Sequence, residues 1–77
     1  MFHVRKNGIV ISGIFDAIYT DDPKVAYGEM DKRLKNDRYF CYHLHPEWRN
    51  AYSLISHDGL CEVEMGVPLP LAVRIKN

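Results

Sequence analysis

Apolar and polar positions alternate along several stretches of the chain, and in one stretch they repeat with helical spacing. Near the start, Phe2 and Val4 alternate with polar residues, and an Asn-Gly pair separates them from the apolar run that follows. Because both positions of Asn-Gly tolerate positive φ, this pattern predicts a β-hairpin with strands at about 2–6 and 9–15. The second strand carries apolar residues on both faces, so we expect it to be central in a sheet and covered on both sides.

Residues 20–37 show the helical pattern. Asp22 is a good N-cap, and Pro23 occupies the first turn, where a proline loses no hydrogen bond. The apolar positions that share one side at helical spacing are Ala26, Tyr27, Met30 and Leu34. The oppositely charged pairs four residues apart are Glu29 with Arg33 and Asp31 with Lys35. Together these features predict an amphipathic helix that lies across a sheet.

The second half of the chain reads as strands. Residues 38–45 alternate up to Pro46, residues 51–65 form a hairpin pattern about Asp58-Gly59, and residues 71–76 alternate at the end of the chain. The predicted order is β-β-α-β-β-β-β. We therefore expect one α+β domain over residues 1–77, an antiparallel sheet of about five to six strands with one helix packed on one face.

The aromatic residues divide into two groups. Alternation or helical spacing assigns most of them to the core, namely Phe2, Phe15, Phe40, Tyr42, Tyr52 and Tyr27. Tyr19, Tyr39 and Trp48 are left over. Because Trp, Tyr and Arg dominate binding hot spots and loops often carry function, these three and Arg49 are the predicted partner-binding residues. The alternative for Trp48 is that it folds back to cover one end of the core.

Composition and charge narrow the class of protein. Hydrophobic residues make up 47% and charged residues 26% of the 77 residues, which is typical of an ordinary globular domain. Ten basic and ten acidic residues cancel, so no overall field draws the protein to nucleic acid or to an anionic membrane. No apolar run is long enough to span a bilayer and no signal peptide is recognisable, so the sequence predicts a cytoplasmic protein.

A row of metal-binding residue types stands in the predicted strand at 38–45. Cys41, His43 and His45 share one face at every second position, and these are residue types that bind zinc. A flat strand spreads such side chains apart, whereas structural zinc sites usually take paired ligands from tight turns. We therefore favour a polar strand face without metal, and we expect no cofactor.

Other chemistry has weaker support. Cys61 with His57 and Asp58 could form a thiol site, but Cys61 alternates with apolar residues and is more simply a core cysteine. The scattered glycines match no phosphate-binding loop. The basic residues Arg5, Arg74 and Lys76 would form a strip for nucleic acid if the first and last strands were neighbours.

Two functions remain, from different classes. The favoured one is a non-enzymatic protein-interaction module, an adaptor or a small inhibitor such as bacteriophages carry, which uses an exposed strand edge and the aromatic and arginine surface. Apolar residues on both faces of the strands at 9–15 and 51–56 extend this to a homodimer. The alternative is a small zinc-binding or thiol-dependent domain that uses Cys41, His43 and His45. Weak nucleic-acid binding is a second alternative.

Overall fold

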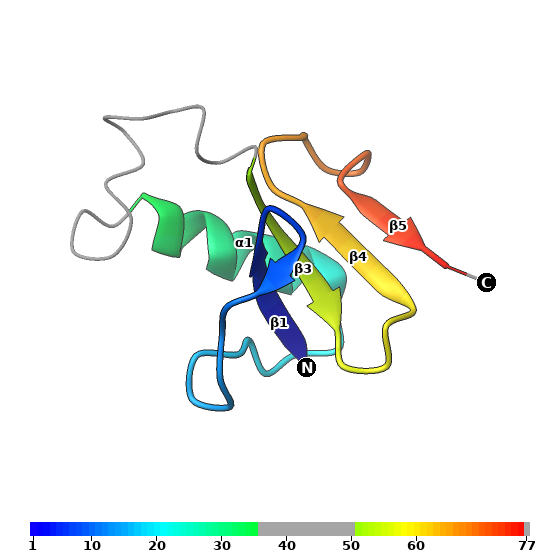
Figure 1. Cartoon of the computed structure of the whole chain (residues 1–77). Coiled ribbons are helices and arrows are strands. Elements are labelled where there is room, and N and C mark those ends of the chain that lie inside the picture. The colour runs from blue at the N-terminus through cyan, green and yellow to red at the C-terminus, as the bar shows by residue number, and fades with distance from the viewer. Residues whose placement is uncertain (36–50, 77) are drawn as a thin grey trace.

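A computed structural model describes residues 1–35 and 51–76 of the chain (Figure 1). These residues form a five-stranded antiparallel sheet with one helix, in the order β-β-α-β-β-β, which confirms the predicted α+β class. The elements are β1 (Phe2–Lys6), β2 (Ile9–Val10), α1 (Pro23–Leu34), β3 (Tyr52–Ser56), β4 (Cys61–Glu64) and β5 (Val73–Ile75). The further strand predicted at 38–45 lies outside the described residues.

The first hairpin turns at the predicted Asn-Gly pair. Asn7 has a φ of 52° and Gly8 a φ of 82°, which are the positive values that a two-residue hairpin turn of this kind requires. Lys6 and Ile9 face each other directly across this turn. The local turn chemistry therefore fixes the register between β1 and β2.

Helix α1 begins and packs as the sequence predicts. The side chain of Asp22 accepts a hydrogen bond from the backbone N–H of Lys24 at 2.9 Å, and so caps the first turn. Of the predicted apolar stripe, Ala26, Met30 and Leu34 are buried, and Tyr27 is partly buried and packs against the core. In the described parts of the chain, no helix is long and apolar enough to cross a membrane.

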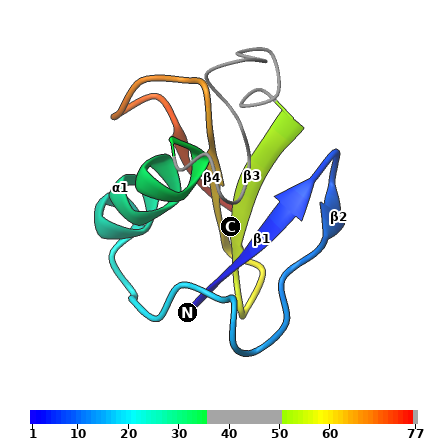
Figure 2. The same ribbon diagram turned by 90° about the vertical axis from the view of Figure 1, so that its left-hand side faces the viewer.

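The strands lie in the order β2-β1-β3-β4-β5. The chain therefore returns from the helix to place β3 beside β1, and β2 and β5 are the two edges of the sheet. Figure 2 shows two layers, with α1 against one face of the sheet and β2 at the edge away from it. No helix of residues 1–35 and 51–76 lies on the other face.

The core fills the space between the sheet and the helix. Its buried members are Phe2, Val4, Ile18, Ala26, Met30, Leu34, Tyr52, Leu54, Val63, Met65 and Ala72. The register aligns Val4, Leu54 and Val63 across three strands, so one face of the sheet is apolar at each of these positions. Val63 and Met65, the apolar residues that were predicted to alternate after Cys61, are both buried, which confirms that part of the hairpin pattern.

Two details of the strand prediction are wrong. The second strand was expected at 9–15 in the centre of the sheet, but β2 contains only two residues and forms an exposed edge. In the last strand, Val73 packs against the core as alternation predicts, whereas Leu71 and Ile75 are exposed. The second strand is short because the chain leaves the sheet after Ile11, and β5 begins only at Val73, so Leu71 lies outside it.

Candidate functional site

Six of the eleven exposed large apolar side chains of the described chain belong to one short segment. We call it the exposed apolar segment; its members are Ile9, Val10, Ile11, Ile14, Phe15 and Tyr19. Phe15 is 98% exposed and Ile14 is 70% exposed. A small domain gains stability by burying such side chains, so their exposure along one segment makes it a candidate binding surface.

The segment leaves the sheet at Ser12, whose side chain takes a hydrogen bond that a backbone carbonyl would accept in a continuing strand. The backbone N–H of Ile11 still donates to the carbonyl of Val4 at 2.8 Å. The next contact is made by the hydroxyl of Ser12, which accepts a hydrogen bond from the Val4 N–H at 2.8 Å. Because this hydroxyl takes the place of a backbone acceptor, β2 ends and the chain turns away from β1.

The chain then returns to the same strand. Phe2 and Ile18 exchange two backbone hydrogen bonds of 2.8 Å each, which forms an isolated bridge at the start of β1. The loop between Ser12 and Ile18 is therefore tied to β1 at both ends. It contains a turn closed by the N–H of Asp16 on the carbonyl of Gly13 at 3.2 Å, and Ile14 and Phe15 lie in this turn.

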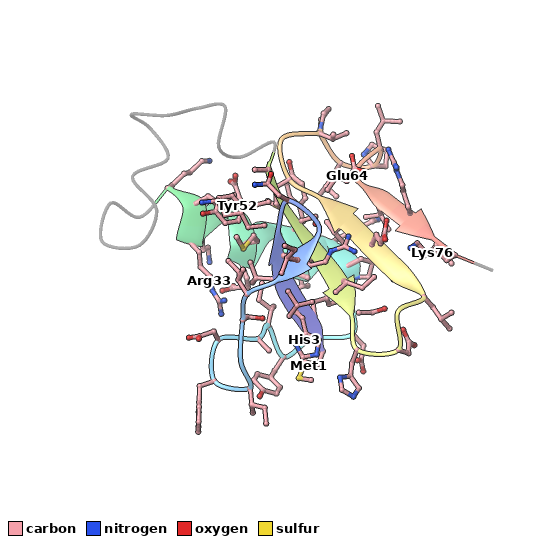
Figure 3. All side chains as sticks on the ribbon, viewed as in Figure 1. Met1, His3, Arg33, Tyr52, Glu64 and Lys76 are labelled. Carbon is pink, nitrogen blue, oxygen red and sulfur yellow. The ribbon has the colours of Figure 1, made fainter. Side chains whose placement is uncertain are left out.

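Two further hydrogen bonds brace the loop. The hydroxyl of Tyr19 donates to the carbonyl of Ile14, and the guanidinium of Arg33 donates from α1 to the carbonyl of Asp16. Arg33 was predicted to pair with Glu29; in Figure 3 it points from the helix toward the loop instead. Phe15 therefore lies on a loop that is fixed to β1 at both ends and is hydrogen-bonded by Tyr19 and Arg33 between them.

The face of the sheet opposite α1, which we call the uncovered face, carries charged side chains that form ion pairs with one another. Glu62 accepts from Lys76 at 2.6 Å and from Arg5 at 3.3 Å, and Arg74 lies 3.1 Å from Glu64. Lys76, followed by Arg5, holds the pKa of Glu62 below its usual value. Figure 3 shows Glu64 and Lys76 along this side of β4 and β5.

This arrangement corrects the predicted basic strip. The first and last strands are not neighbours, because β3 and β4 lie between them. Arg5 and Lys76 share Glu62 and Arg74 pairs with Glu64, so carboxylates on the same face balance two of these three positive charges. The geometry gives no support to nucleic-acid binding on this face.

The thiol site finds no support in its electrostatics. Burial raises the pKa of the Cys61 thiol, and the carboxylates of Asp58 and Glu62 raise it further. A reactive cysteine needs the opposite shift. The hydroxyl of Ser56 and the N–H of Leu60 hold the pKa of Asp58 low, and these contacts serve the turn between β3 and β4.

Most residues chosen from the sequence lie outside the described part of the chain. These are Tyr39, Trp48 and Arg49 of the partner surface, and Cys41, His43 and His45 of the metal row. Tyr19 is described, and it belongs to the exposed apolar segment. Among residues 1–35 and 51–76, no three His, Cys, Asp or Glu side chains are grouped so that they could hold a metal ion.

Sequence reasoning missed the residue that dominates this surface. Alternation assigned Phe15 to the core, and the structure shows that this is wrong. The available signal was Ser12-Gly13, a dipeptide that favours a turn and so ends a strand before Phe15. Comparison with known proteins gave no match, either to a family model, to a curated protein or to a solved structure.

Proposed function

We propose that this protein is a non-enzymatic interaction module, an adaptor or inhibitor, that binds another protein through β2 and the loop that follows it. The observation that carries the proposal is the exposed apolar segment, with Phe15 at 98% exposure. Burying a phenylalanine side chain from water yields about 1.5–3 kcal/mol. That gain is not realised in the free chain and is available to a partner.

The size and shape of the segment favour a protein partner. With half or more of each side chain exposed, its six members offer on the order of 600 Å² of surface, close to the roughly 800 Å² that each partner buries in a standard interface. A small molecule would need a concave site that encloses it. The Phe15 loop projects outward, so it suits a protein that supplies the pocket.

The braced loop favours tight binding. A flexible loop loses conformational entropy when a partner fixes it, and this opposes association. Here Tyr19 and Arg33 hold the loop through the carbonyls of Ile14 and Asp16. Phe15 can therefore act as a rigid anchor of the kind found at binding hot spots.

Strand β2 adds a second mode of contact. It pairs with β1 on one side and forms the edge of the sheet on the other. A partner strand can extend a sheet at such an edge through backbone hydrogen bonds, while side-chain pockets beside it give specificity. The proposed partner is thus a protein with an apolar pocket for Phe15 next to a strand that can pair with β2.

A different protein suits this surface better than a second copy. In a symmetric dimer the same patch meets itself. That arrangement would press one projecting Phe15 loop against another, and neither copy would supply the pocket. We therefore favour a heterologous partner and treat the homodimer as an outcome of the test. Tyr39, Trp48 and Arg49 remain predicted contributors.

A site-specific crosslinker tests this proposal. The photoreactive residue p-benzoylphenylalanine is placed at position 15 or, as the control, at position 71, since Leu71 is 71% exposed near the opposite edge of the sheet. We expect one protein to be crosslinked from position 15 and not from position 71. A crosslink only between two copies of the chain would favour the homodimer.

Affinity measurements then decide whether the contact matters. With the purified partner, Phe15→Ser should weaken binding at least about 30-fold, the effect of a hot-spot residue worth 2 kcal/mol, and Leu71→Ser should not change it. Both variants replace an exposed apolar side chain, so they should be equally well folded. Equal affinities for both variants and the wild type would contradict the proposal.

A further inference from the structure

Two histidines from distant parts of the chain meet on the uncovered side of the sheet. The Nε2 atom of His3 lies 3.0 Å from the Nδ1 atom of His57, and the ring centroids are 5.3 Å apart. His3 belongs to β1 and His57 follows β3, and His3 is labelled near the start of β1 in Figure 3. We propose that this pair is a binding site for a divalent transition-metal ion of the zinc type.

The distance between the two nitrogens matches two ligands of one ion. Imidazole nitrogens bind Zn²⁺ at about 2.0–2.1 Å, so two of them stand about 2.9 Å apart at a right angle and about 3.4 Å apart at the tetrahedral angle. The observed 3.0 Å falls within this range. The same spacing serves a hydrogen bond in the metal-free protein, in which one ring donates and the other accepts. A metal ion would replace the shared proton, with both nitrogens as donors of an electron pair.

The backbone holds the two residues side by side before any metal binds. Phe2 pairs with Ser56 and His3 pairs with Ile55 in the ladder between β1 and β3. The N–H of His57 continues this ladder by donating to the carbonyl of Met1 at 2.9 Å. Because only side-chain torsions need to adjust, chelation requires little loss of conformational freedom.

The site supplies two protein ligands. In the described ranges 1–35 and 51–76, no third His, Cys, Asp or Glu joins the pair. The nearby carboxylate of Asp58 is engaged by Ser56 at 2.6 Å and by Leu60 at 3.0 Å. Water would fill the two remaining positions of a tetrahedral ion, one more than in open zinc sites with three protein ligands.

Isothermal titration of the full chain with ZnCl₂ tests the proposal. Zn²⁺ is the probe because its distance to imidazole nitrogen is the one that the spacing of the pair matches. We expect one Zn²⁺ per chain in the wild type. His3→Gln and His57→Gln should each weaken binding at least about tenfold, since one imidazole then acts without a second ligand held beside it.

Controls separate this site from others in the chain. The double variant His43→Gln, His45→Gln should bind Zn²⁺ like the wild type, and circular dichroism should show that every variant is folded. Zinc binding that survives the loss of both His3 and His57 but disappears with His43 and His45 would overturn the proposal. So would unchanged affinity in His57→Gln, or no binding to the wild type. These outcomes do not depend on whether Phe15 binds a partner.

Discussion

Phe2 and Phe15 should respond in opposite ways to the same substitution. Phe2 is 2% exposed and packs in the core, whereas Phe15 is 98% exposed. Phe2→Ala removes a buried ring and should cost about 3–5 kcal/mol. Phe15→Ala leaves no cavity and should change the free energy of unfolding by no more than about 0.5 kcal/mol.

These magnitudes are large relative to the stability of so small a domain. A chain of 77 residues is expected to have a free energy of unfolding of about 4–11 kcal/mol. Phe2→Ala therefore brings the protein close to unfolding, and the milder Phe2→Leu serves as a second variant that stays folded. Phe15→Ala should leave the urea midpoint in place.

Urea unfolding, followed by far-ultraviolet circular dichroism, measures both effects under the same conditions. The slope of free energy against urea should be similar in the wild type and in Phe15→Ala, because the surface exposed on unfolding hardly changes. A loss of more than about 2 kcal/mol for Phe15→Ala would refute the reasoning, since a loss of that size indicates a side chain packed within the protein. The exposed apolar segment would then be a covered part of the free chain.

Three further predictions concern the fold, and urea unfolding measures each of them. Asp22→Ala removes the acceptor of the Lys24 N–H and should cost about 1 kcal/mol, so an unchanged midpoint would show that the cap is unimportant. Gly8→Ala places a side chain on a residue with a φ of 82° and should also cost about 1 kcal/mol. Folding lowers the pKa of Glu62 from its ordinary 4.5, so its ion pairs contribute stability above that pH. This stability is lost as the pH falls through the pKa that Glu62 has in the folded protein. Glu62→Gln should therefore flatten the dependence of stability on pH below about 4.5, whereas Glu29→Gln, which removes an exposed carboxylate, is the control.

The parts of the fold with local causes could be predicted from the sequence. Asp22 and Pro23 determine where α1 begins, and they act through neighbouring backbone groups. Asn7 and Gly8 determine the first turn through their own φ angles. In each case the residues that create the feature are adjacent in the chain.

The parts that depend on distant pairing could not be predicted. The Ser12-Gly13 pair indicates a turn, but the contact that ends β2, between the Ser12 hydroxyl and the N–H of Val4, depends on the pairing with β1 and is not visible in the sequence. Phe15 was therefore assigned to the core. His3 and His57 are 54 residues apart, and only the pairing of β1 with β3 brings them together.

The exposed apolar segment also changes the functional hypothesis, because it places the proposed binding surface mostly on residues that the sequence did not select. The sequence predicted a strand edge and an aromatic surface, with Tyr19 among its residues. The described structure retains the edge, at β2, and adds the braced loop that carries Ile14 and Phe15. The proposed function thus rests on a different aromatic residue from those the sequence favoured.

Hydroxyl-radical footprinting of Phe15, read by mass spectrometry in the free protein and in the complex with the partner that crosslinking identifies, tests the proposed surface most directly. We expect Phe15 to be oxidised readily in the free protein and protected in the complex, while buried Phe2 is protected in both. A Phe15 side chain already protected in the free monomer, or equally oxidised in the complex, would contradict the claim that this loop is the binding surface.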